Sequence, residues 1–231
     1  MSNSKGIKYN WFSIPKLYML TSNLPLETIT SINQYLDELI LSKNKKDHSK
    51  TLVGQIRNGE QLTIDVNHPL MKDYKKITIN LCKEYMKVFK EKSGNNNIFT
   101  ENTKLEFDEA WSVHSFDGDY NPRHDHKTKS ETGLSTTLWT KVPQQIIDSP
   151  DINDENFSPN ESSGHFDGCI DFQPFDHGAR VSHDLRLGGT LTVKPTVSKM
   201  FIFPSWLLHS VYPFRGPGER RTVASNINIW N

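Results

Sequence analysis

Three histidines are spaced as the ligands of a metal ion could be. His124 and His126 are separated by one residue, at the start of an extended stretch that follows the turn-forming residues 118–122. In a strand, residues two apart project from the same face, so both imidazoles would point one way and Asp125 the other. His209 opens a later predicted strand, after a buried apolar run and a proline-led corner. Three such ligands would cap one face of an octahedral metal and leave about three positions open.

The histidine pattern alone is a weak signal. An H-x-H pair fixes only two letters, and a surface turn with exposed imidazoles explains it as simply. A single histidine at the end of a strand, such as His209, usually does no more than form hydrogen bonds. The interpretation as a metal site therefore needs support from another part of the chain.

Arg220 and Thr222 could hold an anion near that metal. Arg220 follows His209 by 11 residues, and on a strand it would share a face with Thr222. A guanidinium is a planar fork of donors that matches a carboxylate, and a nearby hydroxyl adds a further hydrogen bond. A buried arginine is costly unless an anion neutralises it, and a dicarboxylate bound to the metal at its other end would do so. The alternative is that Arg220 and Arg221 are two solvated charges near the end of a hairpin.

Two amphipathic helices are predicted in the first hundred residues to support this site. Apolar residues recur at three- and four-residue steps over residues 26–41 and again over residues 70–90, and Pro69 stands at the start of the second pattern. Stripes of this kind cover one face of a sheet.

The pattern changes to short β-type runs after the polar residues 93–97. The predicted strands are 106–116, 134–142, 168–172, 190–193, 199–203, 209–212 and 221–229. Many short strands without intervening helices favour an antiparallel sandwich or barrel. We therefore expect one α+β domain, residues 1–231, with helical support over about residues 20–95 and a jelly roll over about residues 104–231. The long polar stretch near residues 144–187 is expected to be a loop beside the substrate or simply a disordered surface segment.

The composition argues against several classes of function. The 27 basic residues equal the 27 acidic ones, whereas a protein that neutralises nucleic-acid phosphates usually has a basic excess. No apolar run approaches the roughly 20 residues of a membrane span, and residues 1–15 hold no signal-peptide core. Cys82 and Cys169 form no C-x-x-C pair and are expected to be small core residues in a reducing cytoplasm. We expect no nucleic-acid or membrane partner, and nothing in the sequence indicates an oligomeric state.

Six motifs, in order along the chain, resemble those of iron(II)- and 2-oxoglutarate-dependent oxygenases. The motifs are TLVGQI at 51–56, GDYNPRHDH at 118–126, GLS at 133–135, KVP at 141–143, FPSWLLHSV at 203–211 and GERR at 218–221. The resemblance is to the uncharacterised type common in tailed phages of marine cyanobacteria, distantly related to prolyl 4-hydroxylases. For a phage protein the cytoplasm would be that of the infected host.

The resemblance implies a double-stranded β-helix, the jelly roll of this family, with N-terminal helices packed on one sheet. It implies that Fe(II) is bound by His124, His126 and His209, and that 2-oxoglutarate is held by Arg220 with Thr222 as its hydroxyl partner. The implied activity is that of a dioxygenase, a hydroxylase. It would use dioxygen and couple oxidation of an unidentified small-molecule or peptidyl substrate to decarboxylation of 2-oxoglutarate to succinate.

One position departs from the superfamily pattern, because His126 stands where a carboxylate is usual. Either the metal has three histidine ligands or a bulge re-aims Asp125, and we predict His126. Three neutral imidazoles would leave iron(II) with about two positive charges instead of about one, which favours binding of a dianion. The same histidines would also suit a zinc hydrolase or hydratase, and a non-catalytic jelly-roll binding module is a further alternative.

Overall fold

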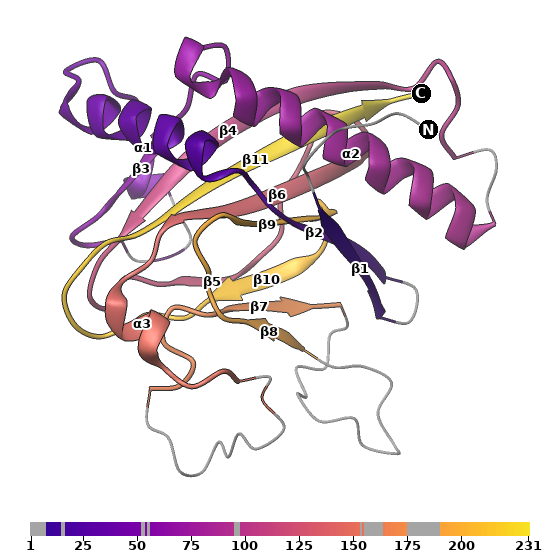
Figure 1. The fold of residues 1–231 in the computed structure, drawn as a ribbon. Coiled ribbons are helices and arrows are strands. Elements are labelled where there is room, and N and C mark those ends of the chain that lie inside the picture. Colours follow the sequence, from indigo (N-terminus) through magenta and orange to yellow (C-terminus); the bar gives the residue numbers. More distant parts are fainter. Residues whose placement is uncertain are drawn as a thin grey trace.

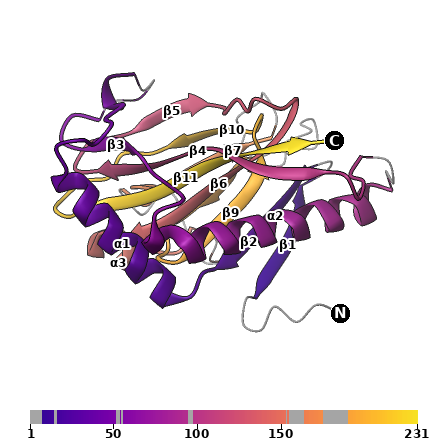
Figure 2. The same cartoon turned by 90° about the horizontal axis from the view of Figure 1, so that it is seen from above.

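Two antiparallel sheets face each other at the centre of the protein, and two long helices cover the outer side of the larger sheet (Figures 1 and 2). The structure, a computed structural model, describes residues 8–14, 17–51, 54, 56–94, 98–152, 154, 164–174 and 190–231. No helix in these ranges is long and apolar enough to cross a membrane.

The chain passes back and forth between the sheets, as in a jelly roll. The larger sheet has the order β1-β2-β9-β6-β11-β4-β3, and its strands are β1 (Tyr9–Ile14), β2 (Leu17–Asn23), β3 (Glu60–Thr63), β4 (Lys104–Ser115), β6 (Thr132–Lys141), β9 (Lys199–Pro204) and β11 (Arg220–Trp230). The smaller sheet has the order β5-β10-β7-β8, with β5 (Asn121–His124), β7 (Ile170–Gln173), β8 (Leu191–Val193) and β10 (Leu208–Val211). From β4 to β11, the chain moves repeatedly from strands of the larger sheet to strands of the smaller one and back. The prediction of an α+β jelly roll is confirmed.

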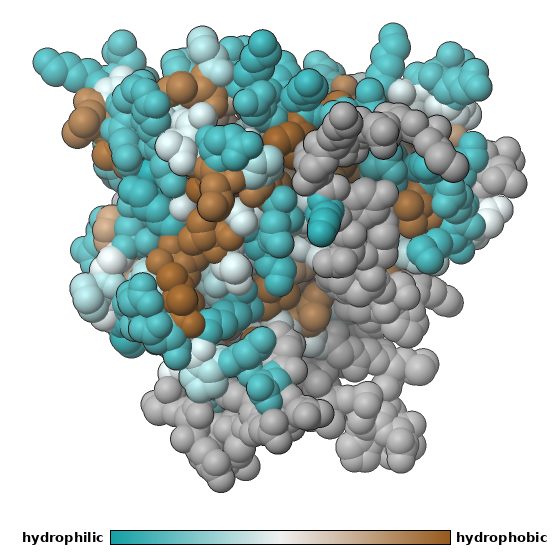
Figure 3. All heavy atoms as spheres, viewed as in Figure 1, coloured by the Kyte–Doolittle hydropathy of each residue, from teal (hydrophilic) through white to brown (hydrophobic). Residues whose placement is uncertain are grey.

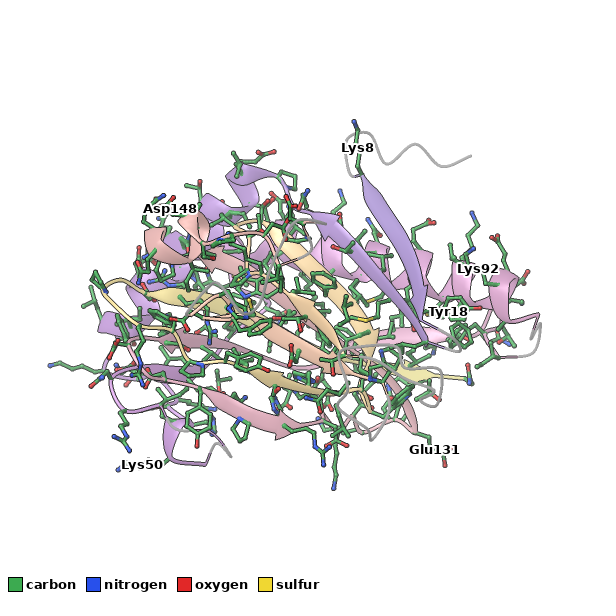
Figure 4. All side chains as sticks on the ribbon, turned by 90° about the horizontal axis from the view of Figure 1, so that it is seen from below. Lys8, Tyr18, Lys50, Lys92, Glu131 and Asp148 are labelled. Carbon is green, nitrogen blue, oxygen red and sulfur yellow. The ribbon has the colours of Figure 1, made fainter. Side chains whose placement is uncertain are left out.

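The helices bury the apolar stripes that the sequence predicts. Helix α1 (Leu26–Leu41) has the predicted bounds, and α2 (Lys72–Ser93) begins after the short 3-10 turn η2 (Pro69–Met71). Ile32 and Tyr74 are fully buried against the larger sheet, while hydrophilic side chains cover most of the outward side of the helices (Figure 3). Beside the end of α2, the Tyr18 hydroxyl of β2 lies 3.5 Å from the Lys92 carbonyl oxygen (Figure 4).

A second apolar cluster fills the space between the sheets. It includes Met19, Trp139, Phe172, Phe201 and Phe203, which all have at most 2% of their surface exposed. Because the helices cover one face of the larger sheet and the smaller sheet covers the other, eight successive residues of β6 are buried. The two cysteines, Cys82 and Cys169, are also buried, as expected for small core residues.

Three strands of the larger sheet, β1, β2 and β3, are not predicted by the sequence pattern. The segment expected to give only helical support therefore also contributes β3 and part of β2. Strand β2 is buried on both sides, so it lacks the alternation that marks a half-buried strand, and β3 buries only Leu62. The stretch near 144–187 contains the short helix α3 (Gln144–Asp148) as well as β7, and residues 153, 155–163 and 175–187 of that prediction lie outside the described residues.

Candidate active site

The strand pairing of the smaller sheet brings the three histidines together. His124 ends β5 and lies directly opposite His209 of β10, with ring centroids 4.3 Å apart. His126 lies beyond the end of β5, where its backbone N–H donates to the Ser205 carbonyl in the turn before β10. Its ring centroid is 4.8 Å from that of His209. One nitrogen from each ring lies within 4.8 Å of the other two, close enough for all three to bind one ion.

In all three rings Nδ1 is hydrogen-bonded, so that Nε2 is the nitrogen that can bind a metal. Nδ1 of His124 lies 2.7 Å from the Pro122 carbonyl, and Nδ1 of His209 lies 2.9 Å from the Leu207 carbonyl. A carbonyl oxygen only accepts, so each Nδ1 carries the proton and each Nε2 keeps a lone pair. Nδ1 of His126 is likewise hydrogen-bonded, to side chains described below. This is the usual arrangement around metal-binding histidines.

Burial keeps the imidazoles in the neutral form that binds metals. It lowers the pKa of His126 to about 4, with a further decrease from the nearby charge of His124. The pKa of His209 falls well below its ordinary value, first through burial and then through both neighbouring rings. Burial also lowers the pKa of His124. The lone pairs are therefore not occupied by protons at neutral pH.

Asp125 is not part of this cluster. Its side chain is exposed, and the metal-binding group among the described residues consists of the three histidines alone. The geometry thus places His126, and not Asp125, beside the other two histidines. One neighbour must move when a metal binds, because the Asn121 amide lies 3.2 Å from Nε2 of His124 and donates to the lone pair that an ion would take.

Arg220 is buried at the beginning of β11, with 3% of its surface exposed. Nη1 donates to the carbonyl oxygens of Gly168 and Tyr212, at 2.9 and 3.2 Å, and Nη2 donates to the Ser115 hydroxyl at 3.3 Å. Gly168 has φ +70°, and a Cβ there would lie 2.6 Å from Cδ1 of Ile146, so this position requires glycine. The backbone is thus shaped to orient the guanidinium.

Among the described residues, no carboxylate forms an ion pair with Arg220, and the charge of the buried Asp119 acts on it only from a distance. Burial lowers the pKa of Arg220 to about 10, so it remains protonated at neutral pH. Its Nε is buried without a hydrogen-bond partner in the described part of the chain. Nε–H and Nη2 share one edge of the guanidinium, the edge that binds a carboxylate with two parallel hydrogen bonds. An uncompensated buried cation is costly, so this edge indicates a site for an anion.

One cavity connects the arginine with the histidines. This inner cavity is lined by the three histidines and by Arg220, together with Thr222, which lies two residues farther along the same face of β11. An outer cleft of about 400 Å³ adjoins it and shares Trp111, Asn121, His124 and His126 with it. His48, Glu109, Asp125 and Lys127 are among the other residues of the outer cleft. All five residues predicted for the site therefore line one cavity.

Arg221 points to the opposite side of the sheet and has a different role. Its guanidinium donates to Glu219 at 2.7 Å and to Asp37 of α1 at 2.7 Å, and only 1% of its surface is exposed. Glu219 also lies 2.6 Å from Nδ1 of His114. The alternative of two solvated arginines is wrong, since both are buried. The sequence gives no local signal for this network, because His114 and Glu219 are 105 residues apart.

Comparisons with known proteins agree with this chemistry. A family model described as "Putative 2OG-Fe(II) oxygenase" matches residues 109–226, which is 118 of the 231 residues and includes all three histidines and Arg220. No curated protein sequence matches the chain.

Several solved structures share the fold. A prolyl-4-hydroxylase from Pseudomonas putida has a TM-score of 0.57 at 14% identity, covering 93% of this chain and 95% of its own. The viral collagen prolyl hydroxylase of Paramecium bursaria Chlorella virus-1, solved with 2-oxoglutarate, has a TM-score of 0.51 at 16% identity, covering 93% and 97%. A prolyl hydroxylase from Trichoplax adhaerens, solved with a peptide fragment of the hypoxia inducible factor oxygen degradation domain, has a TM-score of 0.55 at 13% identity, covering 91% and 83%.

Proposed function

Because the chain belongs to the family of iron(II)- and 2-oxoglutarate-dependent oxygenases, we propose that His124, His126 and His209 hold the iron and that Arg220, with Thr222, holds the distal carboxylate of 2-oxoglutarate. The enzyme couples oxidation of a substrate by dioxygen to decarboxylation of 2-oxoglutarate to succinate. The observation that carries the residue assignment is a buried guanidinium whose Nε has no hydrogen-bond partner among the described residues, in the same cavity as three converging imidazoles.

The donor set suits iron(II). Imidazole nitrogen binds iron well, and three such ligands on one side of the ion leave positions for a bidentate keto acid and for dioxygen. Iron and 2-oxoglutarate supply the oxidative chemistry when bound, and the protein contributes binding, orientation and exclusion of water. A site with three neutral ligands keeps the full charge of the ion, which favours a dianionic cosubstrate.

The cavity also suits the other end of 2-oxoglutarate. The free Nε–H of Arg220 needs an acceptor, and the Thr222 hydroxyl is on the same face of β11. Apolar side chains, including Val113, Ile170 and Val211, form much of the remaining wall. In such surroundings the attraction between a guanidinium and a carboxylate is stronger than in water. A zinc hydrolase or hydratase would give this arginine no role.

The outer cleft is the proposed route for the substrate. It opens beside His124 and His126 and offers both carboxylates and a lysine for recognition. A small molecule or a peptide segment would fit this position, and the peptide bound to the Trichoplax adhaerens enzyme supports the second class. The balanced net charge of the chain argues against nucleic acid as the substrate.

Two variants test the residue assignment. We expect His209→Ala to lose both iron and succinate formation, whereas Arg220→Ala should lose succinate formation and retain nearly all of its iron. Arg215→Ala is a matched control, because the Arg215 side chain is 74% exposed and its ion pair with Asp117 is long, at 3.8 Å. Iron content after anaerobic reconstitution and succinate release from 2-oxoglutarate are the readouts. Equal iron loss in the His209 and Arg220 variants would contradict the assignment.

A further inference from the structure

Asn226 contacts the Nδ1 edge of His126, the edge that faces away from the proposed metal position. The asparagine lies on β11 and has 1% of its surface exposed. Its Oδ1 is 3.1 Å from Nδ1 of His126. Its Nδ2 donates to Oε1 of Glu109 at 3.0 Å and, more weakly, to the Lys127 carbonyl at 3.4 Å. A carboxylate, an amide and an imidazole are thus connected in series.

The carboxylate determines the orientation of the amide. Glu109 and the Lys127 carbonyl only accept hydrogen bonds, so the NH₂ group of Asn226 must face them. Oδ1 then faces His126 and also accepts from the Ser135 hydroxyl at 2.7 Å. Because Oδ1 cannot donate, Nδ1 of His126 must carry the proton, and Nε2 keeps its lone pair.

His126 differs from the other two histidines in this respect. The Nδ1 atoms of His124 and His209 are bonded to carbonyl groups of their own segments, two residues away. The tautomer of His126 depends instead on side chains from β4, β6 and β11. Substitutions in these strands can therefore alter the orientation of the His126 ring without changing the segment that carries His126.

A β-bulge in β4 lies where Glu109 meets Asn226. The pairing of β11 with β4 passes from Asn226 opposite Glu109 to Ile227 opposite Phe107, so Asp108 is an extra residue in β4. Bulges of this kind re-aim side chains and are frequent next to active sites. Here the bulge lies directly beside the contact between Asn226 and Glu109.

We propose that Glu109 and Asn226 are positioning residues that fix His126 in its metal-binding tautomer and orientation. The inference rests on the proposed role of His126 as a ligand. A hydrogen bond from the imidazole N–H to an acceptor polarised by a carboxylate also increases the donor strength of Nε2. The second ligand of this site is thereby connected to a negative charge through one amide, although no carboxylate binds the metal.

The first test is the affinity for a metal probe, cobalt(II), measured on the full chain. Asn226→Leu keeps the size of the side chain and removes its hydrogen bonds to His126, Ser135, Glu109 and the Lys127 carbonyl, and we expect it to weaken cobalt binding about 10- to 100-fold. Asn228→Leu is the matched control, since Asn228 lies two residues along the same strand, is 2% exposed, and its side-chain oxygen accepts hydrogen bonds from the backbone N–H and the hydroxyl of Ser130. Native-like affinity in Asn226→Leu, or an equal loss in both variants, would overturn the proposal.

A rescue experiment separates positioning from packing. Asn226→Asp alone places two carboxylates against each other and should weaken cobalt binding. Adding Glu109→Gln supplies an amide that donates to the new carboxylate at position 226, which in turn accepts from His126, so the double variant should regain most of the affinity. A role in packing alone predicts no such recovery. Failure of the double variant to improve on Asn226→Asp would count against the proposed positioning of His126 by Glu109 and Asn226.

The tautomer can be observed directly by ¹⁵N NMR of the histidine rings in the metal-free protein. We expect a protonated Nδ1 on His126 in the native chain and a mixture of tautomers in Asn226→Leu. An unchanged ring in that variant would refute the proposal. His126→Ala separates the two levels of inference. If His126→Ala binds cobalt normally, the assignment of His126 as a ligand fails. If His126→Ala loses cobalt while Asn226→Leu does not, only the positioning role of Glu109 and Asn226 fails.

Discussion

Arg220→Met removes the guanidinium proposed to bind the distal carboxylate of 2-oxoglutarate and keeps an unbranched apolar side chain in the cavity. Truncating one partner of a buried, hydrogen-bonded charge pair typically costs about 2–5 kcal/mol. At 1.4 kcal/mol for each factor of ten, 2-oxoglutarate should bind roughly 30-fold to several thousand-fold more weakly. The same change leaves the Gly168 and Tyr212 carbonyls without their donor, which costs about 1–3 kcal/mol for each unsatisfied group.

Damage to the fold and loss of the contact must therefore be separated. The assay compares 2-oxoglutarate with 2-oxopentanoate, which has the same chain length and carries a methyl group in place of the distal carboxylate. Isothermal titration calorimetry on protein loaded with nickel(II), a redox-inert substitute for iron, gives both dissociation constants. The native protein should bind 2-oxoglutarate roughly 30-fold to several thousand-fold more tightly than 2-oxopentanoate. In Arg220→Met the two dissociation constants should become nearly equal.

A conservative variant refines the comparison. Arg220→Lys keeps the positive charge and loses the planar fork, so it should recover only part of the preference. Arg215→Met, a change at an exposed arginine, should leave the preference intact. If Arg220→Met retained the native preference for the dicarboxylate, the role assigned to this residue would be refuted.

Three further outcomes are expected. Nickel(II) at 100 times its dissociation constant should stabilise the native fold by about 2.7 kcal/mol and raise Tm by about 5–10 °C, as followed by calorimetry, whereas His209→Ala should show almost no shift. Arg221→Met should lower the unfolding free energy in urea by about 3 kcal/mol and leave the preference for 2-oxoglutarate unchanged; a lost preference would mean that the two arginines are not separable. Burial alone would raise the pKa of Glu219, but hydrogen bonds with His114 and Arg221 outweigh it and lower the pKa to about 2. This depressed pKa contributes roughly 3 kcal/mol that is present above pH 4.5 and is lost as the pH falls toward 2, so Glu219→Gln should flatten the urea-unfolding profile in that window.

Much of the site could be predicted because its signals are local. The H-x-H spacing predicted that His124 and His126 lie on one face, and the proline-led corner before His209 predicted that His209 begins a new strand. Their convergence depends on the pairing of β5 with β10, which the spacing alone does not specify. Strand alternation predicted that Arg220 and Thr222 share a face, and the structure adds that both Arg220 and Arg221 are buried.

The unpredicted features depend on long-range contacts. Helix α1 was predictable because its apolar stripe repeats within a few residues. Strand β3 was not, since its place in the sheet depends on pairing with β4, some fifty residues later. The contact between Glu109 and Asn226 joins residues 117 positions apart and requires a bulge in β4. A pattern of residue types along the chain does not reveal such pairs.

A crystal structure of the protein prepared anaerobically with iron(II) and 2-oxoglutarate would test the central claim most directly. We predict one metal ion bound to Nε2 of His124, His126 and His209, with the distal carboxylate of 2-oxoglutarate hydrogen-bonded to Nε and Nη2 of Arg220. Coordination by Asp125 in place of His126, or a 2-oxoglutarate that makes no contact with Arg220, would contradict the account.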